Sequence, residues 1–412
     1  MSAATPESRW SWLPVILACH GFDAATISDE IARLGLDMQL VHNRTEAMVL
    51  PAGVSKGTGL RTALEHLAVS PHNTVAIGDA ENDLSMLDAA EIGVAVANAI
   101  DSVRRHADLL LDTEDGHGVA QFLRGPVISG AQVVAPQRHN VRIGQTPDGI
   151  AVTIPGSQAS ILLSGATGTG KSHLTGLLVE RWIEAGYTVF VIDPEGGHAA
   201  LSRLPATIVI DASASQSDDQ LLQALRQHHG SVVLDLAHLE PSQVRHYLDG
   251  VASGVETLRS SYGRPHWVVI DAAHGLLRED GPISDTFRPY EGGYCYVTYQ
   301  PEGVCAAALA SIDLTLTPLV HDPSAAVGPP RALYHPRGGS EIAFDVDARL
   351  TPHVRHRHKC ADTPLPIRHR FAFRDQHGCV ICSPSTLQEF EQQLLLVPAE
   401  RVQHHALNRN TT

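Results

Sequence analysis

The sequence lacks features that would point to a membrane, a disulfide scaffold or a nucleic-acid surface. No apolar run approaches the roughly 18 residues that a membrane span needs. Its six cysteines are scattered over 412 residues, which is typical of a reducing compartment. The net charge is −15 and no dense lysine and arginine block offsets it, so nucleic-acid binding is possible only through a local basic patch. These absences favour a cytoplasmic protein without membrane contact.

The composition predicts a globular chain with several domains. Hydrophobic residues make up 43% and charged residues 18%, and the length allows two or three domains. Short apolar strands alternate with helical patterns, which predicts an α/β fold with parallel sheets. From composition and turn signals we expect a first domain at 1–124, a linker at 125–140, a second domain at 141–346 and a small C-terminal module at 347–412.

The strongest motif follows an apolar run at Ile161–Leu163 and precedes a helical pattern that ends near Gly186. It fits G-x-x-x-x-G-K-[ST], and its strand–loop–helix setting predicts a phosphate-binding loop, or P-loop. The glycines let backbone N–H groups converge on phosphate oxygens, and the helix adds its positive end. The expected ATP-binding residues are Gly165, Thr167, Gly168, Thr169, Gly170, Lys171 and Ser172.

A P-loop needs a second Mg²⁺ ligand at the end of another strand, opposite the Ser172 hydroxyl. Asp271 ends Val268-Val-Ile-Asp271 and is our first candidate. Asp235, which ends Val232-Val-Leu-Asp235, is the competing candidate. We prefer Asp271 because Ala-Ala-His274 follows it.

With the P-loop, two further stretches carry a resemblance to the HerA/FtsK group of P-loop ATPases: Val191-Ile-Asp-Pro-Glu195-Gly and Ile270-Asp-Ala-Ala-His274. The resemblance implies that Gln300, after the next strand, is a polar sensor that orients water. It also implies a glutamate after Asp271, where this chain has Ala272. Alanine is no general base, so we expect weak or absent hydrolysis, with Glu195 as the nearby substitute.

Polar residues in the first domain suggest a second phosphate chemistry. Asp79 and Asp83 follow an apolar strand four residues apart, a pattern that can hold a hard cation such as Mg²⁺. Lys56 precedes them and can neutralise a phosphate. In this order, Lys56 and Gly78-Asp79-Ala-Glu-Asn82-Asp83 resemble the back half of a haloacid-dehalogenase-like (HAD) phosphatase of the Cof-type group. That family's nucleophile lies in an Asp-x-Asp motif, which residues 1–50 do not contain.

The C-terminal module offers little chemistry. Cys379-Val-Ile-Cys382 with Cys360 and four histidines is a weak match to a zinc site, and core thiols are the more economical interpretation. A strand is expected at Arg368–Phe373 and a helix at Ser385–Leu395.

Taken together, the patterns predict a P-loop NTPase parallel sheet preceded by a partial HAD-like, Rossmann-type α/β domain. The expected function is binding of ATP and Mg²⁺ with weak or absent hydrolysis, by a chain that can form a homo-oligomer. Two alternatives stay open: an active ATPase motor, and a phosphatase whose nucleophile segment is missing from this chain.

Overall fold

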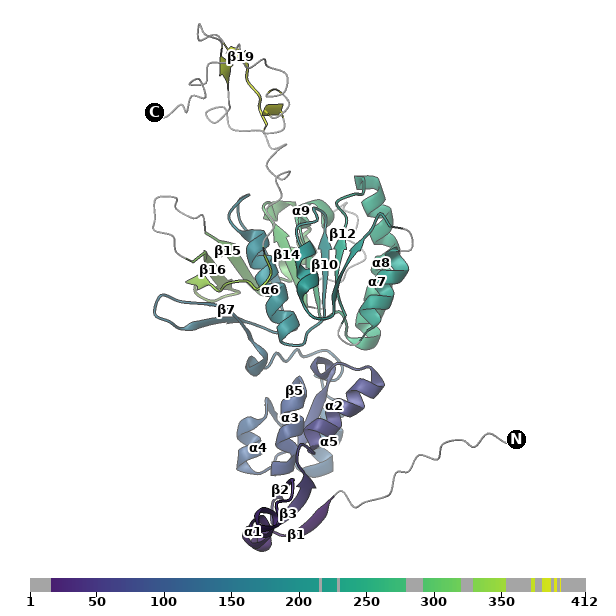
Figure 1. Ribbon diagram of the computed structural model, residues 1–412, viewed down its shortest axis with the longest axis vertical. Helices are drawn as coiled ribbons and strands as arrows, with labels where there is room; N and C mark the ends of the chain where they lie inside the picture. Colours follow the sequence, from purple (N-terminus) through teal and green to yellow (C-terminus); the bar gives the residue numbers. More distant parts are fainter. Residues whose placement is uncertain are drawn as a thin grey trace, which may run out of the picture. The chain divides into compact units, whose positions relative to one another are not determined.

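A computed structural model describes residues 16–214, 217–227, 230–278, 292–319, 329–352, 372–374, 380–386, 389–390 and 393. The chain divides into two compact units, Met1–Pro352 and His353–Thr412. Parallel sheets with flanking helices confirm the predicted α/β class (Figure 1). In the part of the chain that the structure describes, no helix is long and apolar enough to cross a membrane.

A three-stranded antiparallel sheet begins the larger unit, in the order β1-β3-β2. Its strands are β1 (Leu17–His20), β2 (Met38–Asn43) and β3 (Glu46–Pro51). Helix α1 (Ala24–Leu34) precedes β2 and ends at Gly35, whose φ of +59° forms a left-handed cap.

A parallel three-stranded sheet follows, in the order β4-β5-β6. Alanine and small aliphatic side chains, among them Ala76, Leu87 and Val103, fill its core. Within residues 16–123 no strand pairs with the outer edge of β4. The elements are α2 (Lys56–Leu67), β4 (Val75–Gly78), α3 (Leu84–Ala89), β5 (Ile92–Ala95), α4 (Asp101–His106), β6 (Leu109–Leu110) and α5 (Asp115–Leu123).

The second half of the larger unit is one sheet of eleven strands, ordered β11-β12-β10-β13-β14-β9-β15-β16-β17-β7-β8. The strands from β11 to β15 are parallel and those from β15 to β8 are antiparallel. The bounds are β7 (Val141–Gln145), β8 (Ala151–Ile154), β9 (Ser160–Ser164), β10 (Val189–Asp193), β11 (Thr207–Asp211), β12 (Ser231–Asp235), β13 (Trp267–Ile270), β14 (Tyr294–Thr298), β15 (Leu314–Pro318), β16 (Arg331–Pro336) and β17 (Ile342–Val346).

Each face of this sheet has its own hydrophobic core, because alternate residues of a strand point to opposite faces. Phe190 and Ile192 of β10 pack with helices α7 (Ser217–Arg226) and α8 (Pro241–Tyr262) on one face. Val189 and Val191 pack with α6 (Lys171–Glu184) on the other face. Figure 1 shows α6 running alongside the strands of this sheet. The helices are α6 (Lys171–Glu184), α7 (Ser217–Arg226), α8 (Pro241–Tyr262), α9 (Ala273–Leu276) and α10 (Ala306–Ala310).

The strand order decides which loops meet. Strands β10, β13, β14 and β9 are parallel neighbours, so all four end at the same edge of the sheet. The loops after them carry residues 194–198, 271–272, 299–300 and 165–170. Strand β12, which carries Asp235, lies beyond β10 and is therefore farther from the P-loop strand than β13, which precedes Asp271.

The segment expected as a linker, 125–140, makes contacts of its own through Arg138. Arg138 donates to both carboxylate oxygens of Asp108 at 3.0–3.1 Å and to the carbonyl oxygens of Ala90 and Glu91 at 2.6 and 2.9 Å. Residues near 138 are thereby held against the β4-β5-β6 region.

The smaller unit is described in part only. Strands β18 (Phe373–Arg374) and β19 (Val380–Cys382) pair antiparallel, and the rings of Phe373 and Phe390 stack with centroids 5.2 Å apart. Most of the strand expected at Arg368–Phe373, most of the helix expected at Ser385–Leu395, and the zinc candidates Cys360 and Cys379 lie outside the described residues.

Candidate functional site

The predicted P-loop lies between buried strand β9 and helix α6. Gly168 and Gly170 have φ values of +83° and +106°, which only glycine adopts readily, so the loop curls where the motif requires it. A Cβ on either residue would meet nothing within 4 Å, so backbone conformation rather than space selects glycine. Ala166, Thr167, Gly168 and Gly170 are exposed, and Gly165 and Thr169 are half-buried. The loop is therefore open to a ligand.

Lys171, the first residue of α6, folds back over this loop. Its Nζ donates to the carbonyl oxygens of Gly165 at 2.8 Å and Ala166 at 2.9 Å. The charge of Lys171 also acts on the carboxyl group of Asp271 and on the ring of His274. The structure thus brings the loop lysine and the strand-end aspartate into one electrostatic site.

Asp271, directly after β13, is almost fully buried and makes two strong contacts. Its Oδ2 accepts a hydrogen bond from His198 Nε2 at 2.9 Å, and its Oδ1 accepts from the backbone N–H of Ala272 at 2.8 Å. Burial opposes ionisation, but these hydrogen bonds and the charge of His198 outweigh it and lower the pKa of Asp271. Asp271 is an anionic side chain at the position expected for the Mg²⁺ ligand.

His198 is a site residue that the sequence motifs do not predict. Its ring is fully buried, and its backbone N–H donates to Asp193 Oδ2 at 2.8 Å. Burial lowers the pKa of His198, but the hydrogen bond to Asp271 and the charge of Asp193 raise it overall. Asp193, His198 and Asp271 each place one ligand-type atom within 4.8 Å of the other two. The only signal in the sequence is a histidine five residues after a strand-ending aspartate.

Glu195 lies in the loop after β10, half-buried, with its backbone N–H donating to Asp193 Oδ1 at 3.2 Å. This fixes the loop backbone next to the Asp193–His198–Asp271 group. Its assignment as a substitute base stays a prediction.

Ala272 occupies the position of the expected glutamate and has an unusual backbone. Its φ and ψ are +51° and +42°, the left-handed region, and it forms the N-cap of α9. A methyl group at this position has no proton-accepting atom. The residue directly after Asp271 therefore offers no carboxylate to a water molecule.

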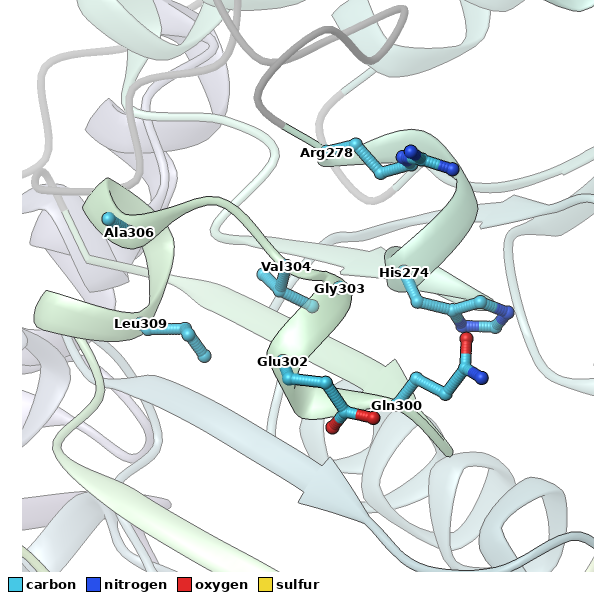
Figure 2. A pocket seen from close by; sticks show the side chains of 8 residues that line it. All are labelled: His274, Arg278, Gln300, Glu302, Gly303, Val304, Ala306 and Leu309. Carbon is cyan, nitrogen blue, oxygen red and sulfur yellow. The ribbon is translucent and has the colours of Figure 1, made fainter.

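Gln300 lies beyond the end of β14 and is exposed. Its backbone N–H donates to Thr298 Oγ1 at 2.9 Å, and the same oxygen contacts His274 Nδ1 at 3.2 Å. Gln300 and His274 line a cavity of about 490 Å³ with Arg278, Glu302, Gly303, Val304, Ala306 and Leu309. Figure 2 shows the Gln300 amide turned toward the His274 ring. The sensor candidate is therefore linked to α9 through Thr298.

A buried ion pair joins Glu180 of α6 to Arg349, which follows β17 in the chain. Arg349 Nε lies 3.3 Å from Glu180 Oε1, and both side chains are nearly fully buried. Arg349 also donates to the carbonyl oxygen of Ser172 at 3.2 Å, and the N–H groups of Leu350 and Thr351 donate to Glu180 at 2.7 and 2.9 Å. This network fixes the helix that begins with Lys171 and Ser172.

In the first region of the larger unit, residues 16–123, the structure brings together Lys56, at the start of α2, and Asp83, which follows β4. Lys56 Nζ pairs with Asp83 Oδ1, and Asp83 Oδ2 accepts from the N–H groups of Asp79 and Ala80 at 2.9 and 3.3 Å. Burial raises the pKa of Asp83, but these contacts outweigh it and lower the pKa. The carboxylate of Asp79 pairs with Arg44 from the β2–β3 turn at 2.5 Å, a partner that the sequence did not suggest.

Family models match two separate segments of the chain. Residues 36–123 match the haloacid dehalogenase-like hydrolase family, and residues 148–262 match the central domain of helicase HerA. Both segments contain residues that the motifs had singled out.

Relatives match parts of the chain. A phosphoglycolate phosphatase of Methanopyrus kandleri is 54% identical over 17% of this chain and 31% of its own length. Phosphoglycolate phosphatase 2 of Saccharolobus solfataricus is 35% identical over 30% of this chain and 51% of its own length. A solved haloacid dehalogenase-like hydrolase from B. subtilis is 29% identical, covers 28% of this chain and 43% of that one, and has a TM-score of 0.24. The chain spans about a third to a half of the length of these phosphatases. The chain is thus a fusion of a haloacid dehalogenase-like region with a HerA-type P-loop region.

Proposed function

We propose that the HerA-type region binds ATP together with Mg²⁺ and hydrolyses it weakly or not at all. The observation that carries this proposal is the convergence of the glycine loop, Lys171 and the ionised, buried Asp271 at one edge of the parallel sheet. The exposed loop leaves its backbone N–H groups accessible to phosphate oxygens.

Each residue has a separate role in this proposal. Lys171 exchanges its two loop carbonyl partners for the β- and γ-phosphates of ATP. The Ser172 hydroxyl and the Asp271 carboxylate hold the metal, and their oxygen atoms suit a hard cation. When bound, Mg²⁺ neutralises phosphate charge. The low pKa of Asp271 supports this fit, because a metal ligand must be deprotonated.

Weak hydrolysis follows from Ala272. A general base contributes about 10²–10⁴-fold to a rate, and no carboxylate occupies this position. Gln300, which lines the cavity shown in Figure 2, can orient a water molecule but cannot take its proton. Glu195 is the proposed substitute base, and Lys171-dependent turnover would point to it.

Nucleotide binding is tested by isothermal titration of ATP with Mg²⁺ into the full chain. We expect binding in the unmodified protein, loss of binding in Lys171→Ala, and unchanged binding in Arg61→Ala, which removes an exposed cation on α2. Equal affinity in all three proteins would overturn the proposal.

A phosphatase remains the second candidate, because Lys56, Asp79 and Asp83 are held together in the first region. Within residues 16–123 the outer edge of β4 has no partner strand, and a strand bearing a nucleophilic aspartate would have to pair there. Hydrolysis of p-nitrophenyl phosphate that is abolished by Asp83→Asn would support this candidate. Hydrolysis that Asp83→Asn leaves unchanged would argue against it.

A further inference from the structure

A second group of metal-ligand side chains lies away from the P-loop, within the larger unit. His72 and Glu91 come from the segments before β4 and β5, and His139 comes from the segment expected as a linker. One ligand-type atom of each lies within 4.8 Å of the others. We propose that His72, Glu91 and His139 bind a divalent transition-metal ion of the Zn²⁺ class.

The contacts of His72 require a proton or a metal ion beside its Nδ1 atom. Its Nε2 lies 3.0 Å from the carbonyl oxygen of Ala185, which can only accept, so this nitrogen carries a proton. Its Nδ1 lies 2.7 Å from Glu91 Oε2. In the neutral ring Nδ1 would then present a lone pair to a carboxylate oxygen, which is repulsive. Either a proton or a metal ion must lie between these two atoms.

His139 makes the metal ion the better fit. Its Nε2 is 3.7 Å from the same Glu91 oxygen and 3.3 Å from the carbonyl oxygen of Ala90, too far for a strong hydrogen bond to either. Tetrahedral zinc with bonds of about 2.0–2.1 Å separates its ligand atoms by about 3.3 Å. The His139–Glu91 spacing is close to this value, and the His72–Glu91 spacing has to widen by about 0.6 Å.

The surroundings resemble the outer shell of a metal site. The bond from His72 Nε2 to a backbone carbonyl is the kind that orients a metal-binding imidazole. Glu91 also accepts hydrogen bonds from Ser157 Oγ at 2.5 Å and Tyr187 Oη at 3.1 Å. The guanidinium of the nearby Arg138 pairs with the Asp108 carboxylate at 3.0 Å.

An ion can reach the site from solvent, because the side chains of His72 and His139 are 12% and 19% exposed while Glu91 is 5% exposed. Zn²⁺ would replace the proton between His72 and Glu91, and that proton would leave to solvent. Two imidazole nitrogens and one carboxylate oxygen leave a fourth position for water.

The test is titration of Zn²⁺ into the metal-free full chain and its variants, with metal content measured after dialysis. We expect one tightly bound equivalent to be lost in His139→Ala and Glu91→Gln and kept in His42→Ala, which removes an exposed histidine on β2. Tyr187→Phe, which keeps all three ligands, should weaken binding about 10–100-fold. C-terminal cysteines and histidines are common to all variants, so the difference reports this cluster.

Equal zinc content and affinity in His139→Ala, Glu91→Gln and the unmodified chain would overturn the proposal and leave a proton between His72 and Glu91. If a ligand variant does not fold, Tyr187→Phe, which removes only the hydroxyl that donates to Glu91, is the test. Zinc affinity that Tyr187→Phe leaves unchanged would then contradict the proposed zinc site. Zinc binding is measured without nucleotide, so its outcome is independent of ATP binding.

Discussion

His198 donates a hydrogen bond of 2.9 Å to Asp271, and both side chains are buried beneath the P-loop edge of the sheet. The pair joins the loop after β10 to the residue that follows β13, and the two residues are 73 positions apart in sequence. It holds the aspartate that we assign to Mg²⁺ in an ionised, fixed position.

Removal of His198 should cost stability. His198→Ala leaves the buried carboxylate of Asp271 without its charged partner, and we expect a loss of about 3–5 kcal/mol in the free energy of unfolding. His198→Gln keeps an N–H donor and should lose less. Urea unfolding of both variants checks this; equal losses would show that the hydrogen bond to Asp271 contributes little.

The buried ion pair between Arg349 and Glu180 of α6 gives a second prediction. Arg349→Met leaves the fully buried Glu180 without a charged partner, so we expect a loss of about 3–5 kcal/mol. The matched control is Arg331→Met, because Arg331 and Asp345 pair at 3.5 Å with side chains 51% and 31% exposed. An exposed pair contributes about 0–1 kcal/mol. Similar unfolding midpoints for the two variants would contradict the assigned role of Glu180.

Glu180 should also make stability depend on pH. Burial raises its pKa, but hydrogen bonds from Thr351 and the backbone, with the charge of Arg349, hold the pKa below its ordinary value of 4.5. A carboxyl whose pKa is lower in the folded state stabilises the fold above its unfolded pKa, and this stability is lost as pH falls below about 4.5. Glu180→Gln should therefore flatten the acid side of the stability profile, whereas Glu65→Gln, on the exposed face of α2, should not.

Two alanines, one inside α2 and one at its C-cap, test the effect of backbone conformation. Ala68, the C-cap, has a φ of +53°, which costs a residue with a Cβ about 1 kcal/mol, so Ala68→Gly should raise the free energy of unfolding by about that amount. Ala63 is exposed within the same helix, and Ala63→Gly should lower it by about 1 kcal/mol. Shifts of the same sign in urea unfolding would show that backbone conformation does not decide the outcome at these two positions.

The sequence predicted the central strands and the P-loop well, because buried parallel strands are continuous apolar runs whose ends are marked by polar residues. The apolar run at Ile161–Leu163 lies within β9, and Val232-Val-Leu-Asp235 lies within β12. The run that leads to Asp271 forms β13, which ends one residue before it, at Ile270. The helix expected to end near Gly186 is α6, which ends two residues earlier, at Glu184.

Contacts between distant segments could not be predicted. His198 reaches Asp271, Arg349 reaches Glu180 across 169 residues, and Arg44 reaches Asp79, and in each case neither residue type nor spacing indicates the partner. The expected linker contains Arg138, whose contacts with Asp108 depend on the folded β4-β5-β6 region. Such pairs are set by tertiary packing.

The central claim is that the P-loop site binds ATP without efficient hydrolysis, and ATP turnover tests it most directly. Phosphate release is measured for the unmodified chain, Lys171→Ala and Ala272→Glu. We predict little or no turnover in the first two proteins and a rate that appears in Ala272→Glu, because a carboxylate after Asp271 restores a general base. Turnover in the unmodified chain that depends on Lys171 would contradict weak hydrolysis and would make Glu195 the first residue to substitute.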